Sequence, residues 1–361
     1  MRISVPHIPQ ASLLAKASGI QYSREEAVER LYNFFRAGKT TVLTGAGVSV
    51  DSGIRAYRGP DGRYMNPNYK PIFYHELVDE TEKGRYFRQR YWLRSYLGYP
   101  PVRDAQPNPT HFALASLQQN GDIPNIITQN VDGLHHKALI LGARQSWPAE
   151  RLEQSILELH GTLHGHVLDR GVFQDMLSQA NPQWHKFAQE METGKESRPR
   201  TNPDGDIAIE HLGISYQDFI VPACPTCLSE GHHNSVHKPE VVFFGESIKK
   251  EVRERSYHDI ESADQLLLIG TTVATYSAFR LVKHALELKK PAILLNVGPT
   301  RADLLPNLEK INMASGSVLI DVAKLLIGTR MNDPVLEAML RSGVVNPPTP
   351  DDDDRAPRAA G

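Results

Sequence analysis

The chain has 361 residues, 40% of them hydrophobic, which is enough for one large core or two modest ones. Its 40 lysines and arginines nearly balance 42 acidic residues, so no overall basic field attracts DNA or RNA, and we expect no nucleic-acid partner. No apolar run is as long as a membrane span, and the N-terminus lacks a secretory hydrophobic region. We therefore expect a soluble intracellular protein that does not enter a membrane.

The two ends of the chain differ in composition from the rest. Residues 1–23 are faintly basic and contain no acidic residue, which suits either a mitochondrial presequence or a flexible N-terminal segment. Residues 331–361 end in a proline-rich, acidic stretch without apolar periodicity, so we predict a disordered tail there.

Between these ends, short apolar runs alternate with helical patterns. This alternation predicts an α/β fold in which a parallel sheet carries helices on both faces. We assign residues 24–162 and 243–330 to this domain. The expected helices are 24–37, 113–119 and 277–289, and the expected strands are 40–44, 125–128, 265–269, 292–296 and 318–320.

Two long segments break the alternation. Residues 163–242 contain a polar passage and both cysteines, Cys224 and Cys227, and we interpret them as an inserted small domain. The spacing of the two cysteines is too tight for an ordinary disulfide framework. Residues 58–109 are rich in tyrosine, arginine, glycine and proline, and we expect a lid with one helix near residues 82–97. Long connections of this kind are often functional.

Glycines follow the first expected strand, where the chain must turn sharply. Gly45 and Gly47 leave no Cβ in the way of a diphosphate. A Gly-x-Gly turn also serves as a plain strand-to-helix connection, and Val50 replaces the third glycine of the dinucleotide fingerprint. The second expected strand adds polar residues at the edge where open α/β sheets bind ligands, namely Gln129, Asn130, Asp132 and His135. Together the two segments predict a nucleotide site.

The loop after the glycines does not fit a hydride-transferring dehydrogenase. Such an enzyme carries an acidic residue about 20 residues further on to hold the adenine ribose, and none is convincingly placed. Instead, residues 51–59 form a polar loop with an arginine suited to a phosphate. His160 ends another apolar run, but a lone histidine is more often a surface or interior residue than a base. We therefore expect the dinucleotide to be held differently.

Five motifs, in this order and spacing, resemble the sirtuin family across roughly residues 5–327. They are Gly45–Ser49 with Gly53-Ile54, Gln129–Asp132, Leu159–Gly161, Lys238–Glu246 and Gly270–Thr272. Three further segments resemble the class II branch, whose vertebrate member is a mitochondrial lipoamidase and ADP-ribosyltransferase: Arg88–Trp92, Gln106–Pro109 and Asn296–Arg301. The resemblance implies a Rossmann-like fold with a zinc-ribbon-derived inserted domain. It favours the mitochondrial matrix over the cytoplasm or nucleus.

The resemblance implies an NAD-dependent protein-lysine deacylase, which releases nicotinamide from NAD and passes the acyl group of a lysine to ADP-ribose. It makes His160 the base that takes a proton from a ribose hydroxyl, with Asn130 and Asp132 as its catalytic companions. Imidazole suits this role because its ordinary pKa of about 6.5 leaves much of it neutral at cellular pH. A mono-ADP-ribosyltransferase or an NAD hydrolase would use the same pocket. A catalytically weak NAD-binding scaffold is a third hypothesis.

The same resemblance distributes other residues around NAD. Asp132 and the backbone near Ile54 would hold the nicotinamide carboxamide, and Gln129 with Asn130 the adjoining ribose. The diphosphate and the adenosine half would meet residues from the glycine turn, the loop after it and the later strand ends. These further cofactor-binding candidates are Gly45, Ala46, Gly47, Ser49, Tyr57, Arg58, Gly270, Thr271, Thr272 and Asn296.

Candidate substrate residues come from two places. Val241, Phe243 and Phe244 would form an edge strand to which an extended acyl-lysine peptide adds, although a core strand has the same pattern. Tyr91 and Arg94 lie three residues apart on the expected lid helix and resemble a Tyr-x-x-Arg pair that reads acidic acyl groups. An exposed helix face fits that pair equally well. We predict a preference for carboxylated or bulky acyl chains over acetyl.

Two departures from the family pattern concern the metal and the cofactor loop. The family usually closes a tetrahedral zinc site with two Cys-x-x-Cys pairs, and Cys224 with Cys227 supplies one. The chain is shortened where the first pair belongs, so zinc binding would need a mixed site. Its candidate ligands are His164, His166, Asp169, His232, His233 and His237. Ala56 stands where the family commonly has aspartate, which removes a carboxylate and favours reduced activity.

Overall fold

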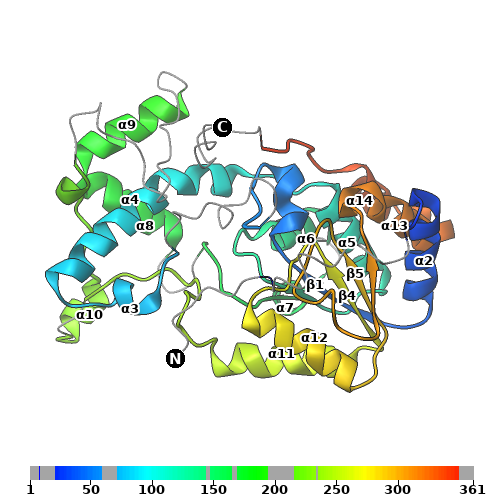
Figure 1. Cartoon of the computed structure of the whole chain (residues 1–361). Coiled ribbons are helices and arrows are strands. Elements are labelled where there is room, and N and C mark those ends of the chain that lie inside the picture. The colour runs from blue at the N-terminus through cyan, green and yellow to red at the C-terminus, as the bar shows by residue number, and fades with distance from the viewer. Residues whose placement is uncertain are drawn as a thin grey trace, which may run out of the picture.

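Figure 1 shows the computed structural model of the chain, which describes residues 8, 21–58, 71–143, 147–164, 169–193, 215–232 and 235–348. A larger lobe is built on a sheet, and a smaller lobe is made of helices and loops. Within the described ranges, no helix combines the length and the apolarity that crossing a membrane requires.

The sheet of the larger lobe has six strands, all parallel, in the order β3-β2-β1-β4-β5-β6. Thr44 at the end of β1 is level with Thr128 at the end of β2 and with Ile269 at the end of β4. The carboxyl ends of the strands therefore form one edge, as in doubly wound nucleotide-binding folds. The strands are β1 Thr40–Thr44, β2 Ile126–Thr128, β3 Ile156–Glu158, β4 Gln265–Ile269, β5 Ala292–Leu295 and β6 Leu308–Ile311.

Helices cover both faces of this sheet, and the predicted α/β class is confirmed (Figure 1). One face packs on α2 Arg24–Arg36, α5 Pro109–Asn120, α6 Leu134–Ala143, α7 Ala149–Gln154, α13 Leu319–Ile327 and α14 Pro334–Arg341. The other face packs on α11 Lys250–Ser262 and α12 Tyr276–Glu287. Short 3-10 turns complete the chain: η1 Ala46–Ser52, η4 Tyr216–Asp218, η5 Ser315–Ser317 and η6 Gly328–Asn332.

Local capping explains where the first helices begin. Ser23 and Glu26 form a reciprocal capping box at the start of α2. Asn108 caps α5 through its side chain, and Pro109 occupies the first turn, where its missing N–H costs nothing. Gly121 ends α5 in the left-handed conformation, which releases the chain toward β2.

The smaller lobe is assembled from two separate parts of the chain. Its helices are α3 Tyr74–Leu77, α4 Glu82–Asp104, α8 Arg170–Ala180, α9 Pro182–Glu192 and α10 Pro225–Ser229. Trp92 and Tyr96 from α4 share one buried cluster with Phe173, Trp184 and Phe219. The expected lid helix is therefore present, but longer, and the lobe includes residues that we assigned to the larger domain. The described residues of this lobe contain no strand ladder, so its zinc-ribbon character stays a prediction.

Two predictions at the C-terminal end are wrong. The run at 318–320 begins helix α13, and the sixth strand is β6, whose sequence LEKI is only partly buried and carries no continuous apolar run. Residues 331–348 are not a disordered tail, because α14 buries Leu336 and Met339 completely or nearly so in the main core. Asp333 caps this helix and Pro334 opens it. Residues 349–361, and most of 1–23, lie outside the described ranges.

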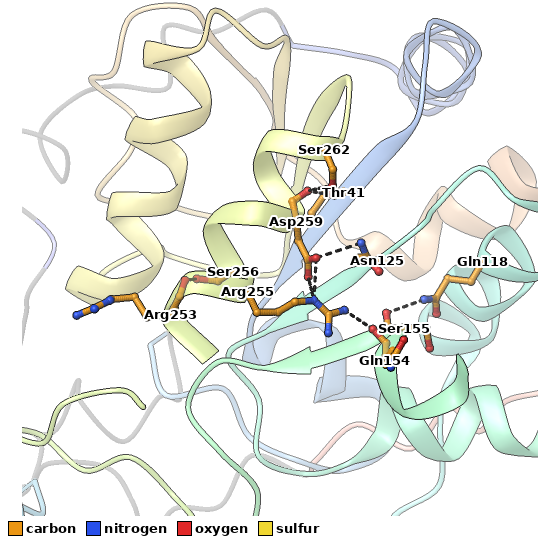
Figure 2. Close-up of polar contacts among 10 residues, drawn as sticks. All are labelled: Thr41, Gln118, Asn125, Gln154, Ser155, Arg253, Arg255, Ser256, Asp259 and Ser262. Carbon is orange, nitrogen blue, oxygen red and sulfur yellow. Dashed lines mark hydrogen bonds and ion pairs between the residues drawn. The ribbon is translucent and has the colours of Figure 1, made fainter. Parts of the chain in front are cut away.

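A buried carboxylate, paired with a partly exposed arginine, ties α11 to the edge of the sheet where the strands begin (Figure 2). Arg255 Nε lies 2.8 Å from Asp259 Oδ1, and Asn125 Nδ2 donates to the same oxygen over 3.2 Å. Thr41 Oγ1 donates to the Asp259 carbonyl over 2.8 Å, and Arg255 also donates to the carbonyl of Gln154. Asp259 is 1% exposed, and this burial raises the pKa of its carboxyl. Asp259 thus connects α11 to β1 and to the loop before β2, and Arg255 adds a contact to the end of α7.

We expect Arg255→Ala to lower the free energy of unfolding by about 2–4 kcal/mol, because it leaves a buried carboxyl without its cation. Urea denaturation followed by circular dichroism measures this. Arg253 is the matched control on the same helix, since its side chain is exposed and points away from the cluster (Figure 2). Arg253→Ala should change stability by less than about 0.5 kcal/mol. Equal effects of the two substitutions would contradict the assigned role.

Candidate functional site

The loop after β1 is packed tightly against the loop after β4. Gly45 N–H donates to the Ile269 carbonyl over 3.1 Å, and Gly47 N–H donates to the Gly270 carbonyl over 2.8 Å. A Cβ on Gly47 would lie 2.7 Å from that carbonyl oxygen, so glycine is required there. Ala46 lies between them, partly buried, at the start of η1. The glycines therefore join two strand ends, a role beyond the close approach to a diphosphate that we predicted.

Ser49 on η1 connects the first loop to the polar run after β2. Its Oγ donates to Asp132 Oδ2 over 2.7 Å and accepts from Asn130 Nδ2 over 3.1 Å. Ile54 N–H donates to the Ser49 carbonyl over 3.3 Å. Burial raises the pKa of Asp132, and the hydrogen bonds from Leu134 N–H and Ser49 oppose this. The network holds a buried carboxyl and a carboxamide at the sheet edge, where they can recognise a polar ligand.

Two buried histidines lie within hydrogen-bond distance of hydroxyl groups in and beside this network. His111 Nε2 lies 3.4 Å from Ser49 Oγ, and His135 Nε2 lies 2.9 Å from Thr44 Oγ1. Their rings are in edge contact, with centroids 4.8 Å apart. Burial lowers the pKa of His111 to about 3 and that of His135 well below its ordinary value, so both are neutral. They position the polar run and its hydroxyl partners.

His160 stands two residues beyond β3, and its ring is fixed from two sides. Nδ1 donates to the Gln129 carbonyl over 3.3 Å, which makes Nε2 the basic nitrogen of the neutral ring. Ser277 Oγ donates to Nε2 over 2.8 Å. Burial lowers the pKa of His160 to about 4, opposed by the Gln129 hydrogen bond. The imidazole is therefore neutral, with its lone pair on Nε2, at physiological pH.

This environment predicts a pH profile. Because the pKa of His160 is lowered to about 4, protonation of the base should not reduce kcat/KM until the pH falls well below the ordinary histidine range. We expect kcat/KM to remain level from about pH 8 to about pH 6, whereas an unperturbed imidazole would lose activity near about pH 6.5. Initial rates across this range, with enzyme stability checked at each pH, test the expectation. An acidic limb centred on the ordinary value would contradict it.

The segments that carry the three predicted catalytic residues run side by side. Leu163 N–H donates to the Val131 carbonyl over 3.0 Å, and His164 Nε2 donates to the Asp132 carbonyl over 2.9 Å. With the bond from His160 to the Gln129 carbonyl, these contacts join the two segments along their length. The structure therefore brings the predicted catalytic residues to one place on the sheet edge.

The ends of β4 and β5 supply the remaining predicted cofactor residues at this same edge. Thr271 Oγ1 accepts from Gln129 Nε2 over 2.8 Å and from Val273 N–H over 3.0 Å. Val273 has a φ of +50°, which is rare for a β-branched residue and marks strain in the turn that contains Gly270–Thr272. Asn296, directly after β5, is buried, and its side-chain amide donates to the next carbonyl over 2.9 Å.

Residues 241–244 are not a strand of the sheet, which corrects the prediction of an edge strand. Val242 N–H donates to the His160 carbonyl over 2.8 Å, and the ends of the stretch form isolated bridges to Gly161 and Phe73. Gly161 has a φ of +75°, which turns the partner chain away and stops the pairing from growing into a ladder. The stretch nevertheless lies directly beside the candidate base.

Tyr91 and Arg94 lie on one side of α4, as their spacing predicts. Tyr91 is 7% exposed, and its ring centroid lies 5.4 Å from that of Phe243. Burial raises the pKa of Tyr91 to about 12, and the nearby Arg94 opposes this. The exposed-face alternative is therefore wrong for Tyr91. In the loop after η1, Tyr57 is 44% exposed and Arg58 is partly buried.

The two cysteines do not complete a metal site with their described neighbours. Cys224 and Cys227 are unbridged at α10, and the described part of the chain has no group of three histidine, cysteine or acidic side chains suited to a metal. The other candidates are engaged elsewhere: His164 on Asp132, Asp169 on the α8 backbone, His232 on Glu230 and His237 on the Phe173 ring. His166 and His233 lie outside the described residues. The donors among the described residues therefore do not complete a tetrahedral zinc site.

Several site residues were missed from the sequence. Ser277 and Thr275, at the start of α12, contact His160 and Gln129, and Thr275 Oγ1 donates to Gln129 Oε1 over 3.1 Å. Hydroxyl residues directly after the Gly-Thr-Thr turn were the available signal. Glu158, the last residue of β3, was also missed, and burial, with the charge of Asp132 adding, raises the pKa of its carboxyl to about 8.

A model of the Sir2 family matches residues 45–277 of the chain. The chain is 41% identical over 312 residues to the NAD-dependent protein deacylase SIR4 of Batrachochytrium dendrobatidis, covering 83% of this chain and 94% of that protein. It is 34% identical over 303 residues to the NAD-dependent protein lipoamidase sirtuin-4, mitochondrial, of Bos taurus, covering 81% and 85%.

Solved structures agree with this family on the fold. One described as "Structural Basis for the Mechanism and Regulation of Sir2 Enzymes" has a TM-score of 0.55 at 24% identity and covers 84% of this chain and 98% of its own. A Sir2 homolog-NAD complex has a TM-score of 0.52 at 23% identity and covers 82% and 93%. With its strand order, its glycine turn and the matched family model, this chain belongs to the Sir2 family.

Proposed function

We propose that this sirtuin is an NAD-dependent protein-lysine deacylase that transfers the acyl group to ADP-ribose and releases nicotinamide. Its substrates are acyl-lysine proteins or peptides. The observation that carries the proposal is His160: a neutral imidazole with its basic nitrogen defined by the Gln129 carbonyl, beside the segment that bears Asn130 and Asp132. The relatives named above, which carry NAD-dependent deacylase or lipoamidase in their names, support it.

The polar residues at the sheet edge suit the parts of NAD. NAD supplies a cleavable nicotinamide–ribose bond and the ribose hydroxyl that accepts the acyl group. Asp132 and the backbone near Ile54 bind the nicotinamide carboxamide, while Gln129 and Asn130 bind the adjoining ribose. The diphosphate lies near Gly45, Ala46, Gly47, Ser49, Tyr57 and Arg58, and the adenosine near Gly270, Thr271, Thr272 and Asn296.

His160 acts as the general base. Its Nε2 takes the proton from a ribose hydroxyl, which can then attack the acyl carbon. Ser277 Oγ donates to Nε2 in the structure, so the ribose hydroxyl replaces the serine as the hydrogen-bond donor. Holding both reacting groups in one place lowers the entropic barrier to the transfer. Val241, Phe243 and Phe244 lie along the entry of the substrate peptide.

The acyl preference follows from the pair on α4. Tyr91 and Arg94 give the lid helix a phenol and a cation on one side, next to Phe243. We propose that carboxylated or bulky acyl groups are removed faster than acetyl. A panel of acyl-lysine peptides of one sequence tests this, and fastest turnover on the acetyl peptide would contradict it.

One experiment tests the reaction. The protein is incubated with NAD and mixed acyl-lysine peptides, nicotinamide release is followed, and the same preparation is analysed for zinc, for which the described residues supply no complete ligand set. Release of O-acyl-ADP-ribose supports the deacylase, whereas protein-bound ADP-ribose would support transfer of ADP-ribose to a protein nucleophile instead. No nicotinamide release with any peptide would leave an NAD-binding scaffold.

We also propose a mitochondrial matrix location. The bovine relative is named as mitochondrial, and residues 1–23 contain no acidic residue, which suits a presequence. Import of a fusion of these residues to a fluorescent protein tests it, and retention of that fusion in the cytosol or nucleus would contradict it.

A further inference from the structure

Arg170, the first residue of α8, is a buried cation held by one face of α4. It is 5% exposed. Its guanidinium carbon lies 5.1 Å from the ring centroid of Trp92 and 4.6 Å from that of Tyr99. Nη2 donates to the carbonyl and to the hydroxyl of Ser95, each over 3.1 Å. Aromatic rings and one serine therefore surround a group that remains charged at any physiological pH.

Two of the three nitrogens of this guanidinium have no hydrogen-bond partner. Nε and Nη1 are both buried and unbonded, and within the described ranges the groups that interact electrostatically with Arg170 are tyrosines, not carboxylates. The adjacent Asp169 uses its side chain to accept from Gly171 and Val172 N–H at the start of α8. A buried charge without a counter-ion is strongly disfavoured, and contact with aromatic rings recovers only part of that cost. Packing alone is therefore a poor explanation for an arginine here.

Arg170 lies close to the candidate active site. Its backbone N–H donates to the His164 carbonyl over 3.4 Å, and the His164 ring bonds to the Asp132 carbonyl over 2.9 Å. On the other side, Arg170 interacts electrostatically with Tyr91, whose ring packs on Phe243 in the 241–244 stretch that bonds to the His160 carbonyl. Arg170 thus connects His164, whose ring bonds to the Asp132 carbonyl, through its backbone, and helix α4, which carries Tyr91, through its guanidinium.

We propose that Arg170 determines acyl specificity by binding the terminal carboxylate of an acidic acyl group on the substrate lysine, through its unbonded Nε and Nη1. The inference rests on the deacylase function proposed above and concerns a different residue from Arg94. A carboxylate would supply both the missing counter-ion and the missing acceptors, and charge-assisted bonds of this kind are the strong ones. Because both donors are buried, the carboxylate reaches them only when a packed side chain shifts, such as Tyr99, whose ring centroid lies 4.6 Å from the guanidinium carbon.

The test uses two peptides of one sequence that differ at a single group. One carries a glutaryl-lysine, and the other carries the primary amide of that glutaryl group, which has the same shape without the charge. We expect the wild-type protein with NAD to favour the acid over the amide by at least about tenfold in kcat/KM, because only the acid supplies a negative charge to pair with the Arg170 guanidinium. Arg170→Met should remove this preference and leave the rate on the amide within about twofold.

Matched variants separate the possible outcomes. Arg94→Met should reduce the preference only in part, because Arg170 still binds the carboxylate; a preference lost in Arg94→Met and kept in Arg170→Met would overturn the proposal. Arg170→Lys keeps the charge but not the planar donors, so it should retain only part of the preference. Equal loss on both peptides in Arg170→Met would assign Arg170 to positioning and overturn the proposal. So would a wild-type protein that does not distinguish acid from amide, even while it releases nicotinamide from both.

A binding measurement makes the proposal independent of turnover. Calorimetric titration of the two peptides into His160→Ala protein should give tighter binding of the acid, and the additional Arg170→Met substitution should abolish the difference. If nicotinamide is never released but the acid still binds more tightly, the proposed function fails while the carboxylate site stands. If Arg170→Met does not fold, the wild-type and Arg170→Lys titrations decide, and equal binding of acid and amide to the wild type would refute the site.

Discussion

His160→Ala is expected to reduce the rate of acyl removal by about 10²–10⁴-fold, the usual contribution of a general base. The imidazole is neutral because burial lowers its pKa to about 4, and its Nε2 is the basic nitrogen because Nδ1 donates to the Gln129 carbonyl. Affinity for NAD should remain within a few-fold, since the glycine turn and the Ser49–Asp132 network do not depend on the ring. Single-turnover acyl transfer and calorimetric NAD titration measure the two effects.

Ser277→Ala is the control for this prediction. It removes the hydroxyl that donates to Nε2 but keeps the base, so turnover should change far less than in His160→Ala. An enzyme that keeps its full rate without the imidazole would refute the role assigned to His160. Loss of NAD binding together with turnover would instead indicate that the ring supports the cofactor loop.

Gly161→Ala is expected to lower the free energy of unfolding by about 3–5 kcal/mol. A Cβ at this position would lie 1.7 Å from the Glu240 carbonyl oxygen, and the φ of +75° is unfavourable for any side chain. Relief requires a shift of the 241–244 stretch, whose Val242 N–H bonds to the His160 carbonyl, so turnover should fall as well. Thermal and urea unfolding of the purified variant measure the stability.

Gly98→Ala is the matched control. Gly98 lies inside α4, and nothing is within 4 Å of the position where its Cβ would be. Alanine is favoured over glycine in a helix interior, so this substitution should stabilise the protein by about 0.5–1 kcal/mol. If Gly161→Ala is as stable as the wild type, the contact between Gly161 and the Glu240 carbonyl does not constrain the site as we describe.

Sequence periodicity predicted the core of the sheet because its strands are continuous apolar runs buried on both faces. β1 and β4 bury all their residues, and their pattern is unmistakable. The edge strand β6 was missed because Glu309 and Lys310 interrupt it, and their side chains pair with Arg30 and Asp303 in the folded chain. Helix α14 was missed because the acidic stretch after it dominated the composition of the segment.

The site was predictable where a residue type follows a strand end, and not where three-dimensional packing decides. Asn130, Asp132 and His160 follow β2 and β3, so their place at one edge was foreseeable. The contact between His111 and Ser49 could not be predicted from the sequence, because only its burial beside His135 distinguishes His111 from the other histidines. The role of Arg170 could not be predicted either, because the sequence does not show that it is buried without a counter-ion once α8 packs on α4.

The aromatic cluster of the smaller lobe can form only late in the synthesis of the chain. Trp92 and Tyr96 leave the ribosome well before Phe173, Trp184 and Phe219, the rings with which they share a cluster. Until those partners are synthesised, α4 exposes a row of aromatic side chains that a chaperone or an aggregating neighbour can bind. Fragments that end before residue 169 should therefore be poorly soluble, and neither stretch of the lobe should fold as an excised piece.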